Sequence, residues 1–170
     1  MKRPSSVRAF VALGATALLV ALVPSAFAAL PRKDAGYQGA STQKAGELTL
    51  PVDLRITQDG KNVSRFDIQW TSKCASPTGR GAIGGLSVTR KMAKGGPVVI
   101  SKEGSFGDST SFTRPLGNSQ TGLFAVVLKG KFTKKTLAKG TFKVTVSIKD
   151  ATGQQVDTCD TGTINWQVRD

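Results

Sequence analysis

The residue types that most enzymes use for acid–base chemistry are scarce in this chain. The sequence contains no histidine, so it lacks the usual general base at neutral pH and every Ser–His or Cys–His nucleophile pair. Ser41 and Lys44 match the S-x-x-K spacing of some serine enzymes, but the companion motifs S-D-N and K-T-G are absent. Ser109 follows Gly107 and Asp108 with no histidine to activate it. The sequence therefore predicts that the protein is not an enzyme.

Carboxylates near the C-terminus offer a second kind of chemistry. Asp150, Asp157 and Asp160 are close enough in sequence to suggest a glycosidase pair or a calcium loop. A calcium loop would need more oxygen ligands, and paired acids would need a cleft. The two cysteines, Cys74 and Cys159, have no C-x-x-C spacing and no histidine partner, which argues against zinc. We expect turn residues beside a disulfide, with no metal and no cofactor.

The N-terminal residues have the pattern of a cleavable secretory signal peptide. Basic residues precede an apolar run over residues 9–23, and Ala26 and Ala28 form the A-x-A motif that places cleavage between Ala28 and Ala29. The run is shorter than the ~20 residues of a membrane-spanning helix, although an uncleaved anchor is the alternative. We expect a mature chain of residues 29–170 that has no stable membrane span and is secreted or held in the cell envelope.

Export would place both cysteines in a compartment where disulfides persist. With two cysteines the pairing Cys74–Cys159 is the one available within the chain. The loop that it closes is long, so the chain-entropy model gives a stabilisation of about 4–5 kcal/mol as an upper value.

The charge of the chain is strongly positive and unevenly distributed. The full sequence carries 24 basic and 11 acidic residues, and removal of the signal peptide leaves a net charge of +10. Between Ser109 and Lys149 there is no acidic residue. A surface of this kind attracts anionic polymers by its long-range field, although solubility alone also places lysine on outward-facing strand positions. The candidate anion-binding residues are Lys129, Lys131, Lys134, Lys135, Lys139 and Lys143.

Alternating apolar residues predict an all-β domain over residues 47–170. Strands are expected at 48–56, 63–70, 83–90, 98–100, 122–132, 142–149 and 164–168. Residues 58–61 and 150–153 have the composition of hairpin turns. Trp70 and Trp166 continue apolar strand faces and belong in the core rather than on a sugar-stacking platform. The fold class is an antiparallel β-sandwich or small β-barrel of about eight strands, preceded by an N-terminal signal helix.

Several local features make this prediction more specific. Pro51 cannot donate a backbone hydrogen bond, so its strand lies on an edge or carries a bulge. A shift in the apolar positions predicts a second bulge near Ser64 and Arg65. Residues 29–46 lack periodicity and are expected to form a flexible arm with Tyr37 exposed, and residues 102–121 are expected to form a loop surface.

Short glycine-containing motifs in the second half of the chain resemble those of a known group of proteins. The motifs are a G-x-F at residues 130–132, an A-x-G-T at 138–141 and a C-D-x-G-x-x-x-W at 159–166. The chain is similar in these positions to a family of small exported bacterial all-β proteins of unknown function. The resemblance implies an all-β fold and carries over no functional residue.

Three functions are compatible with these features. The first is a monomeric, non-catalytic binding or envelope-associated domain whose basic 129–149 hairpin contacts anionic cell-wall or surface polymers. Nucleic acid is not expected as a partner of an exported protein. The second is a carrier barrel that holds a small apolar ligand behind Trp70 and Trp166. The third is a secreted hydrolase inhibitor acting through residues 102–121.

Overall fold

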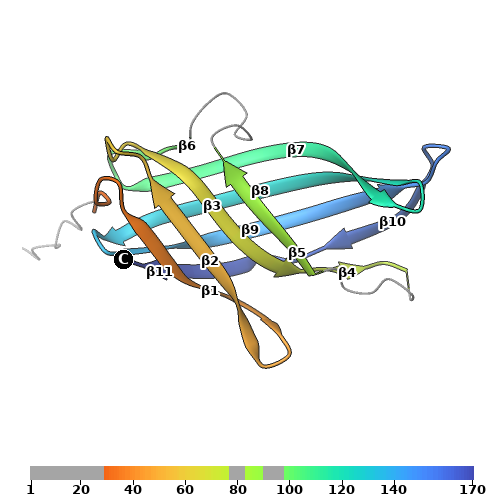
Figure 1. Cartoon of the computed structure of the whole chain (residues 1–170), viewed down its shortest axis with the longest axis horizontal. Coiled ribbons are helices and arrows are strands. Elements are labelled where there is room, and N and C mark those ends of the chain that lie inside the picture. Colours follow the sequence, from red (N-terminus) through yellow and green to blue (C-terminus); the bar gives the residue numbers. More distant parts are fainter. Residues whose placement is uncertain (1–28, 77–82, 90–97) are drawn as a thin grey trace, which may run out of the picture.

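One curled antiparallel sheet forms a half-barrel and makes up the whole described structure (Figure 1). The computed structural model describes residues 29–76 and 98–170, together with the backbone of residues 83–89. This part of the chain contains strands and no helix. The strands are β1 (Gly36–Ala45), β2 (Leu48–Ile56), β3 (Asn62–Thr71), β4 (Lys73–Cys74), β5 (Ile83–Thr89), β6 (Val98–Val99), β7 (Ser105–Gly117), β8 (Gln120–Lys134), β9 (Leu137–Lys149), β10 (Gln155–Asp160) and β11 (Ile164–Arg169).

Strand β9 is the centre of the sheet. On one side, β9 pairs with β8 along nearly its full length, and β8 pairs in turn with β7. Its other edge is shared, because β11 pairs with the first half of β9 and β10 pairs with the second half. From β11 the sheet continues through β1, β2 and β3 to β5. The chain of β3 runs on into β4, which pairs with β10, so the sheet curls back on itself at this end.

A side chain completes the curled end where two strands separate. The register between β1 and β2 shifts between Ala40 and Lys44, and Gln43 lies in that shift. Its side-chain amide donates to the carbonyl oxygen of Thr71 at 2.9 Å and accepts from the Thr71 N–H at 2.8 Å. It also donates to the carbonyl oxygen of Thr161 at 3.2 Å. The side-chain amide of Gln43 therefore makes the pair of hydrogen bonds to Thr71 that a neighbouring strand would otherwise make, and so links β1 to the end of β3.

The core lies on the concave side of the sheet and is rich in aromatic rings. Phe66 packs against Trp166 with ring centroids 5.1 Å apart, and Phe106 lies 6.1 Å from the same indole. The prediction that Trp70 and Trp166 belong to the core is confirmed, since both are buried. The rings of Phe66 and Phe106 therefore pack against the Trp166 face, one of the two faces behind which the carrier hypothesis places its ligand.

Two glycines make room for these rings. Phe106, Gly130, Gly140 and Trp166 are cross-strand neighbours in one row over β7, β8, β9 and β11. A Cβ atom on Gly140 would clash with the carbonyl oxygen of Lys129 and would lie 2.6 Å from Cζ2 of Trp166. The small residue at position 140 is thus required by the packing of the strand against its neighbours.

The prediction of a flexible arm over residues 29–46 is wrong. Strand β1 lies inside the sheet between β2 and β11, and the domain begins well before residue 47. Tyr37, expected to be exposed, is fully buried, and its hydroxyl donates to the carbonyl oxygen of Lys135 at 2.6 Å. The strand was missed because its small and polar residues give no apolar alternation, and its place is fixed by pairing on both edges.

The prediction of a loop over residues 102–121 is also wrong. Strand β7 pairs with β8 almost throughout. Phe106 and Phe112 lie on its inner face, with Asp108 and Thr110 between them at the alternate positions that face inward. The polar residues at these inner positions hide the period of two. An inhibitor acting through a long loop here would have to act through a strand instead.

Other local predictions are confirmed. The register of β2 and β3 shifts beside Ser64, as the second bulge requires. Pro51 lies in an interior strand at the β1–β2 irregularity, so the bulge and not the edge accounts for it. Gly60 and Gly153 adopt positive φ angles in the expected hairpin turns. The signal peptide, its helix and the Ala28 side of the cleavage site lie outside the described residues.

Candidate functional site

The six candidate lysines are divided among three places in the structure. Lys129, Lys131 and Lys139 lie on the outer surface of β8 and β9, where their side chains are exposed. We refer to these three residues as the lysine face. Lys134 and Lys135 lie at the turn between the two strands. Lys143 lies further along β9. Lys143 is on the same outer surface as the lysine face, so four of the six predicted residues share one surface and two lie at the turn.

The strand register places two like charges opposite each other on the lysine face. Lys131 of β8 pairs directly with Lys139 of β9, and Lys129 pairs with Thr141. Side chains directly opposite in an antiparallel pair have Cβ atoms about 5 Å apart, and like charges at that distance destabilise the sheet. Among the described residues, neither Lys129 nor Lys139 forms an ion pair. The fold therefore carries an unfavourable charge pair at this point.

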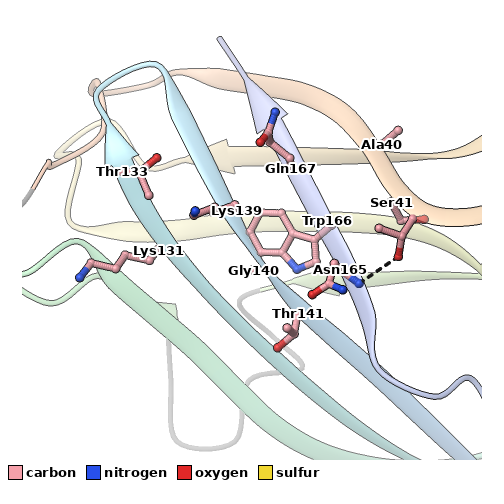
Figure 2. A pocket seen from close by; sticks show the side chains of 11 residues that line it. Ala40, Ser41, Lys131, Thr133, Lys139, Gly140, Thr141, Asn165, Trp166 and Gln167 are labelled. Carbon is pink, nitrogen blue, oxygen red and sulfur yellow. Dashed lines mark hydrogen bonds between the residues drawn. The ribbon is translucent and has the colours of Figure 1, made fainter.

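A shallow hollow of about 610 Å³ lies between these lysines and the neighbouring strands (Figure 2). Polar side chains from three strands surround it: Lys131 and Thr133 from β8, Lys139 and Thr141 from β9, and Asn165 and Gln167 from β11. Ala40, Ser41 and Thr42 of β1 border it on the far side, and Gly140 and Trp166 complete the lining. The lining contains no carboxylate.

The amide and hydroxyl groups around the hollow remain available. Within the described part of the chain, the side chains of Asn165, Gln167, Thr133 and Thr141 make no hydrogen bond to protein. The polar contacts at the border of the hollow have backbone donors: the N–H of Asn165 donates to Oγ1 of Thr42 and the N–H of Gln43 donates to Oγ of Ser41, each at 3.2 Å. Amides and hydroxyls both donate and accept hydrogen bonds. The hollow thus combines two ammonium groups with several unused polar groups.

Carboxylates near the lysines belong to other networks. The pKa of Glu103 is lowered chiefly by a hydrogen bond from the Ser101 hydroxyl. The positive charge of Lys131 makes a smaller electrostatic contribution in the same direction. Lys143 forms an ion pair with Asp160 at 3.1 Å. Burial raises the pKa of Asp160, but hydrogen bonds from the Gly162 N–H, Lys143 and Thr145 outweigh it and lower the pKa overall. Lys143 is therefore compensated, unlike Lys139.

Strands β2 and β3 carry a second charged surface of a different kind. Asp53 pairs with Asp67 across the strands, and Arg55 pairs with Arg65 in the next outward-facing row. Arg65 and Asp67 form an ion pair. The four side chains line one small surface hollow of about 220 Å³. We name these four residues the charge square, and its charges sum to zero.

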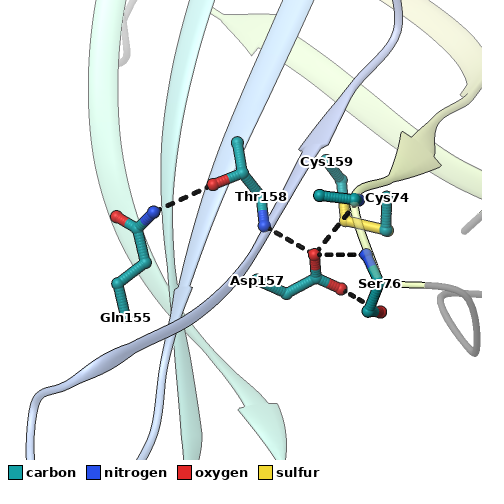
Figure 3. The surroundings of a disulfide bond; sticks show 7 residues. Cys74, Ser76, Gln155, Asp157, Thr158 and Cys159 are labelled. Atoms are coloured by element: carbon teal, nitrogen blue, oxygen red, sulfur yellow. Dashed lines mark hydrogen bonds between the residues drawn. A yellow bond between two sulfur atoms is a disulfide. The ribbon is translucent and has the colours of Figure 1, made fainter.

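The Cys74–Cys159 disulfide is formed and joins β4 to β10 (Figure 3). Cys74, Cys159 and Asp157 bring three potential metal ligands close together. Both sulfurs are consumed by the disulfide. The Asp157 carboxylate accepts hydrogen bonds from the Ser76 hydroxyl at 2.6 Å and from the N–H groups of Ala75, Ser76 and Thr158. In this oxidised state the cluster is a structural clamp.

The three aspartates considered from the sequence serve separate networks. Asp150 accepts hydrogen bonds from Thr152 and Gln154 within its own hairpin. Asp157 accepts hydrogen bonds from Ser76 in the segment after Cys74. Asp160 accepts a hydrogen bond from Thr145 and forms an ion pair with Lys143. Asp150 lies at a hairpin turn, as expected, whereas Asp157 and Asp160 lie in strand β10, so the expectation of turn residues is wrong for these two. The disulfide itself is typical of proteins from an oxidising compartment.

Sequence reasoning missed the polar residues that surround the hollow. Thr133, Thr141, Asn165 and Gln167 are outward-facing residues of ordinary amphipathic strands, and the alternating pattern does predict that they face solvent. Their meeting at one hollow depends on β11 pairing with the first half of β9. No local pattern specifies which half of a long strand a distant strand will choose.

Comparison with known proteins finds no matching family, no matching curated protein and no matching solved structure. Across the described residues, no helix combines the length and the apolar character that crossing a bilayer would require.

Proposed function

We propose that this protein is an exported, non-catalytic domain that binds anionic polymers of the cell envelope through its lysine face. The observation that carries the proposal is the direct opposition of Lys131 and Lys139 beside a hollow without a carboxylate. A fold gains nothing from two opposed ammonium groups, and an anion between them would relieve their repulsion.

The long-range charge of the chain supports the same function. A net charge near +10 for the mature chain draws polyanions toward the protein, and an acid-free stretch from residue 109 to 149 concentrates the field on β8 and β9. Exposed lysines are separated along a strand by about 7 Å and across strands by about 5 Å. An extended polymer could therefore contact several of them at once.

The test compares two pairs of cations removed from different faces. The double variant Lys131→Ala/Lys139→Ala removes two opposed cations from the lysine face. Its matched control, Arg55→Ala/Arg65→Ala, removes two opposed cations from the charge square and changes the net charge equally. Binding is measured by sedimentation with cell wall from the producing cells, before and after chemical removal of its anionic polymers, at 50 mM and 500 mM salt.

We expect the lysine variant to lose about 30-fold in affinity at low salt, since two cations near an anionic surface contribute roughly 2 kcal/mol. The arginine variant should change by less than about threefold. Wild-type binding should weaken at high salt and should require the anionic polymers. The proposal would be overturned if both variants lost the same affinity, or if wild-type binding were equally strong at 50 mM and 500 mM salt.

A further inference from the structure

The hollow next to the lysine face has a chemistry that bare charge does not explain. A purely electrostatic surface needs cations and open space. This hollow adds amide groups from Asn165 and Gln167 and hydroxyl groups from Thr133 and Thr141, none of which is used by the described protein. These groups can both donate and accept hydrogen bonds.

The distinction between donors and acceptors limits what the hollow suits. A phosphate or sulfate oxygen accepts hydrogen bonds and offers no donor to an amide or threonine oxygen. A hydroxylated unit donates as well as accepts, so it can satisfy both sides of an amide. The carbonyl oxygens of Asn165 and Gln167 thus favour a ligand that carries hydroxyl groups next to its negative charge.

The dimensions agree with one such unit. The lysines of β8 and β9 and the amides of β11 are spread over two strand spacings, or about 10 Å. Figure 2 shows Asn165 and Gln167 on the strand that borders Lys139, and Lys131 on the opposite side of the hollow. A single ring-sized unit fits between the two sets of groups, with its charge toward the lysines and its hydroxyls toward β11.

The border of the hollow on β1 is low. Ala40 pairs with Gln167 of β11 and borders the space with a single methyl group. Gly140 contributes only its backbone to the lining, because a Cβ atom there would point toward the buried ring of Trp166. The long polar side chains of β8, β9 and β11 therefore stand beside a border of small residues.

We infer that the hollow is a subsite for one hydroxylated, negatively charged unit of an envelope glycopolymer, such as a sugar acid. The inference rests on the proposed function, since it assigns a subsite within the same binding face. Lys131 and Lys139 contact the anionic group, and Asn165 and Gln167 contact hydroxyl groups on the same unit. The lysines supply affinity for anions in general, and the amides select the hydroxylated ones.

The experiment separates charge from hydroxyl recognition with three defined probes. Hexagalacturonate carries both carboxylates and hydroxyls, linear hexaphosphate carries charge without carbon hydroxyls, and maltohexaose carries hydroxyls without charge. Isothermal titration measures their binding to the wild type, to Asn165→Leu/Gln167→Met and to Lys131→Ala/Lys139→Ala. The matched control is Gln38→Met, an exposed glutamine of β1 outside the hollow.

We expect Asn165→Leu/Gln167→Met to weaken hexagalacturonate binding about tenfold, the loss that two neutral hydrogen bonds produce. Hexaphosphate binding should stay within twofold in that variant, and Gln38→Met should change neither probe. The lysine variant should weaken both anions, and maltohexaose should bind at least tenfold more weakly than hexagalacturonate. Thermal unfolding of each variant identifies any that fails to fold, and Gln167→Met alone then replaces the double variant.

Two results would overturn the inference, and they differ in what they leave standing. If the amide variant weakens neither anion, or weakens both equally, the subsite for hydroxyls is wrong while the anion-binding face survives. If wild-type protein binds no anion, the proposed function fails together with the subsite. Maltohexaose binding equal to that of hexagalacturonate would show that charge has no role in the hollow.

Discussion

The lysine face and the charge square solve the same structural problem in different ways. Both place like charges opposite each other on neighbouring strands: Lys131 against Lys139 in one case, Arg55 against Arg65 in the other. In the charge square, Asp53 and Asp67 occupy the next row and compensate the arginines. The lining of the lysine hollow contains no acid.

In the charge square the opposed cations have acidic neighbours on both strands. Among the described residues, Lys139 has no ion-pair partner and Lys131 has only the weaker electrostatic attraction of Glu103. Solubility would be served as well by a charge square on β8 and β9, because mixed charges keep a surface hydrated. The absence of acids near Lys139 is therefore the part of the charge pattern that solubility does not require. That absence supports the proposal that the binding surface lies on β8 and β9 rather than on β2 and β3.

The largest expected effect comes from cutting the covalent link between the two faces. The disulfide joins the continuation of β3, which carries the charge square, to β10, the neighbour of the lysine strand β9. Its cysteines are 85 residues apart, so the variant Cys74→Ala/Cys159→Ala should lose about 4–5 kcal/mol of unfolding free energy. Urea denaturation of the variant and of the oxidised wild type measures the difference.

The control for this prediction is the wild type under reducing conditions, which should unfold at the same urea concentration as the alanine variant. Both should show a single transition, because β9 connects β10 to β8 and β11 within one sheet. Two separate transitions would mean that the two faces belong to independently folding units, and the comparison between them would then lose its basis.

The fold could be predicted where apolar residues alternate and could not where pairing alone fixes a strand. Strands β2, β3 and β9 follow from period-two patterns, and the turn at Gly60 follows from its dipeptide. Strand β1 has few apolar side chains, and its stability derives from hydrogen bonds to β2 and β11. Such non-local pairing leaves no trace in a local window.

The candidate site divides along the same line. The lysines could be found from composition, because charge is a property of the sequence. The hollow could not, because it depends on the register that aligns Lys139 with Gln167 and Thr141 with Asn165. Register is set by contacts between strands distant in the chain, and the half-barrel in place of a sandwich or closed barrel has the same origin.

A substitution at Gly140 should destabilise the sheet through the packed row of β8, β9 and β11 that underlies the lysine face. A valine there would force its Cβ against the Lys129 carbonyl and the Trp166 ring, and overpacking of this kind costs about 1–3 kcal/mol. Urea denaturation of Gly140→Val gives the loss, with Ala125→Val, an exposed position on β8, as control. A fully stable Gly140→Val protein would contradict the close packing of this row.

Removing the opposed cations should have opposite effects on the stability of the two faces. The variant Lys131→Ala/Lys139→Ala relieves repulsion and should gain about 0.2–1 kcal/mol, whereas Arg55→Ala/Arg65→Ala leaves Asp53 opposite Asp67 and should lose a similar amount. Urea midpoints at low salt measure both, and 1 M salt should shrink both by screening. If both double variants changed the unfolding free energy in the same direction, the neighbouring aspartates would not distinguish the charge square from the lysine face.

The smallest expected effect concerns Lys143, the compensated lysine. The hydrogen bonds from the Gly162 N–H, Lys143 and Thr145 lower the pKa of Asp160 below its ordinary value, in spite of the burial that raises it. A carboxyl whose pKa is lower in the folded state stabilises the fold above its unfolded pKa near 4, and this contribution disappears as the pH falls through the folded pKa. The ion pair of Lys143 and Asp160 is partly exposed, so screening limits its contribution to stability to about 0.2–1 kcal/mol.

The variant Asp160→Asn should therefore be less stable than the wild type at pH 7, and the unfolding free energies of the two proteins should converge toward pH 2. Parallel curves across that range would mean that Asp160 does not compensate Lys143, and the contrast between Lys143 and Lys139 would have to be abandoned.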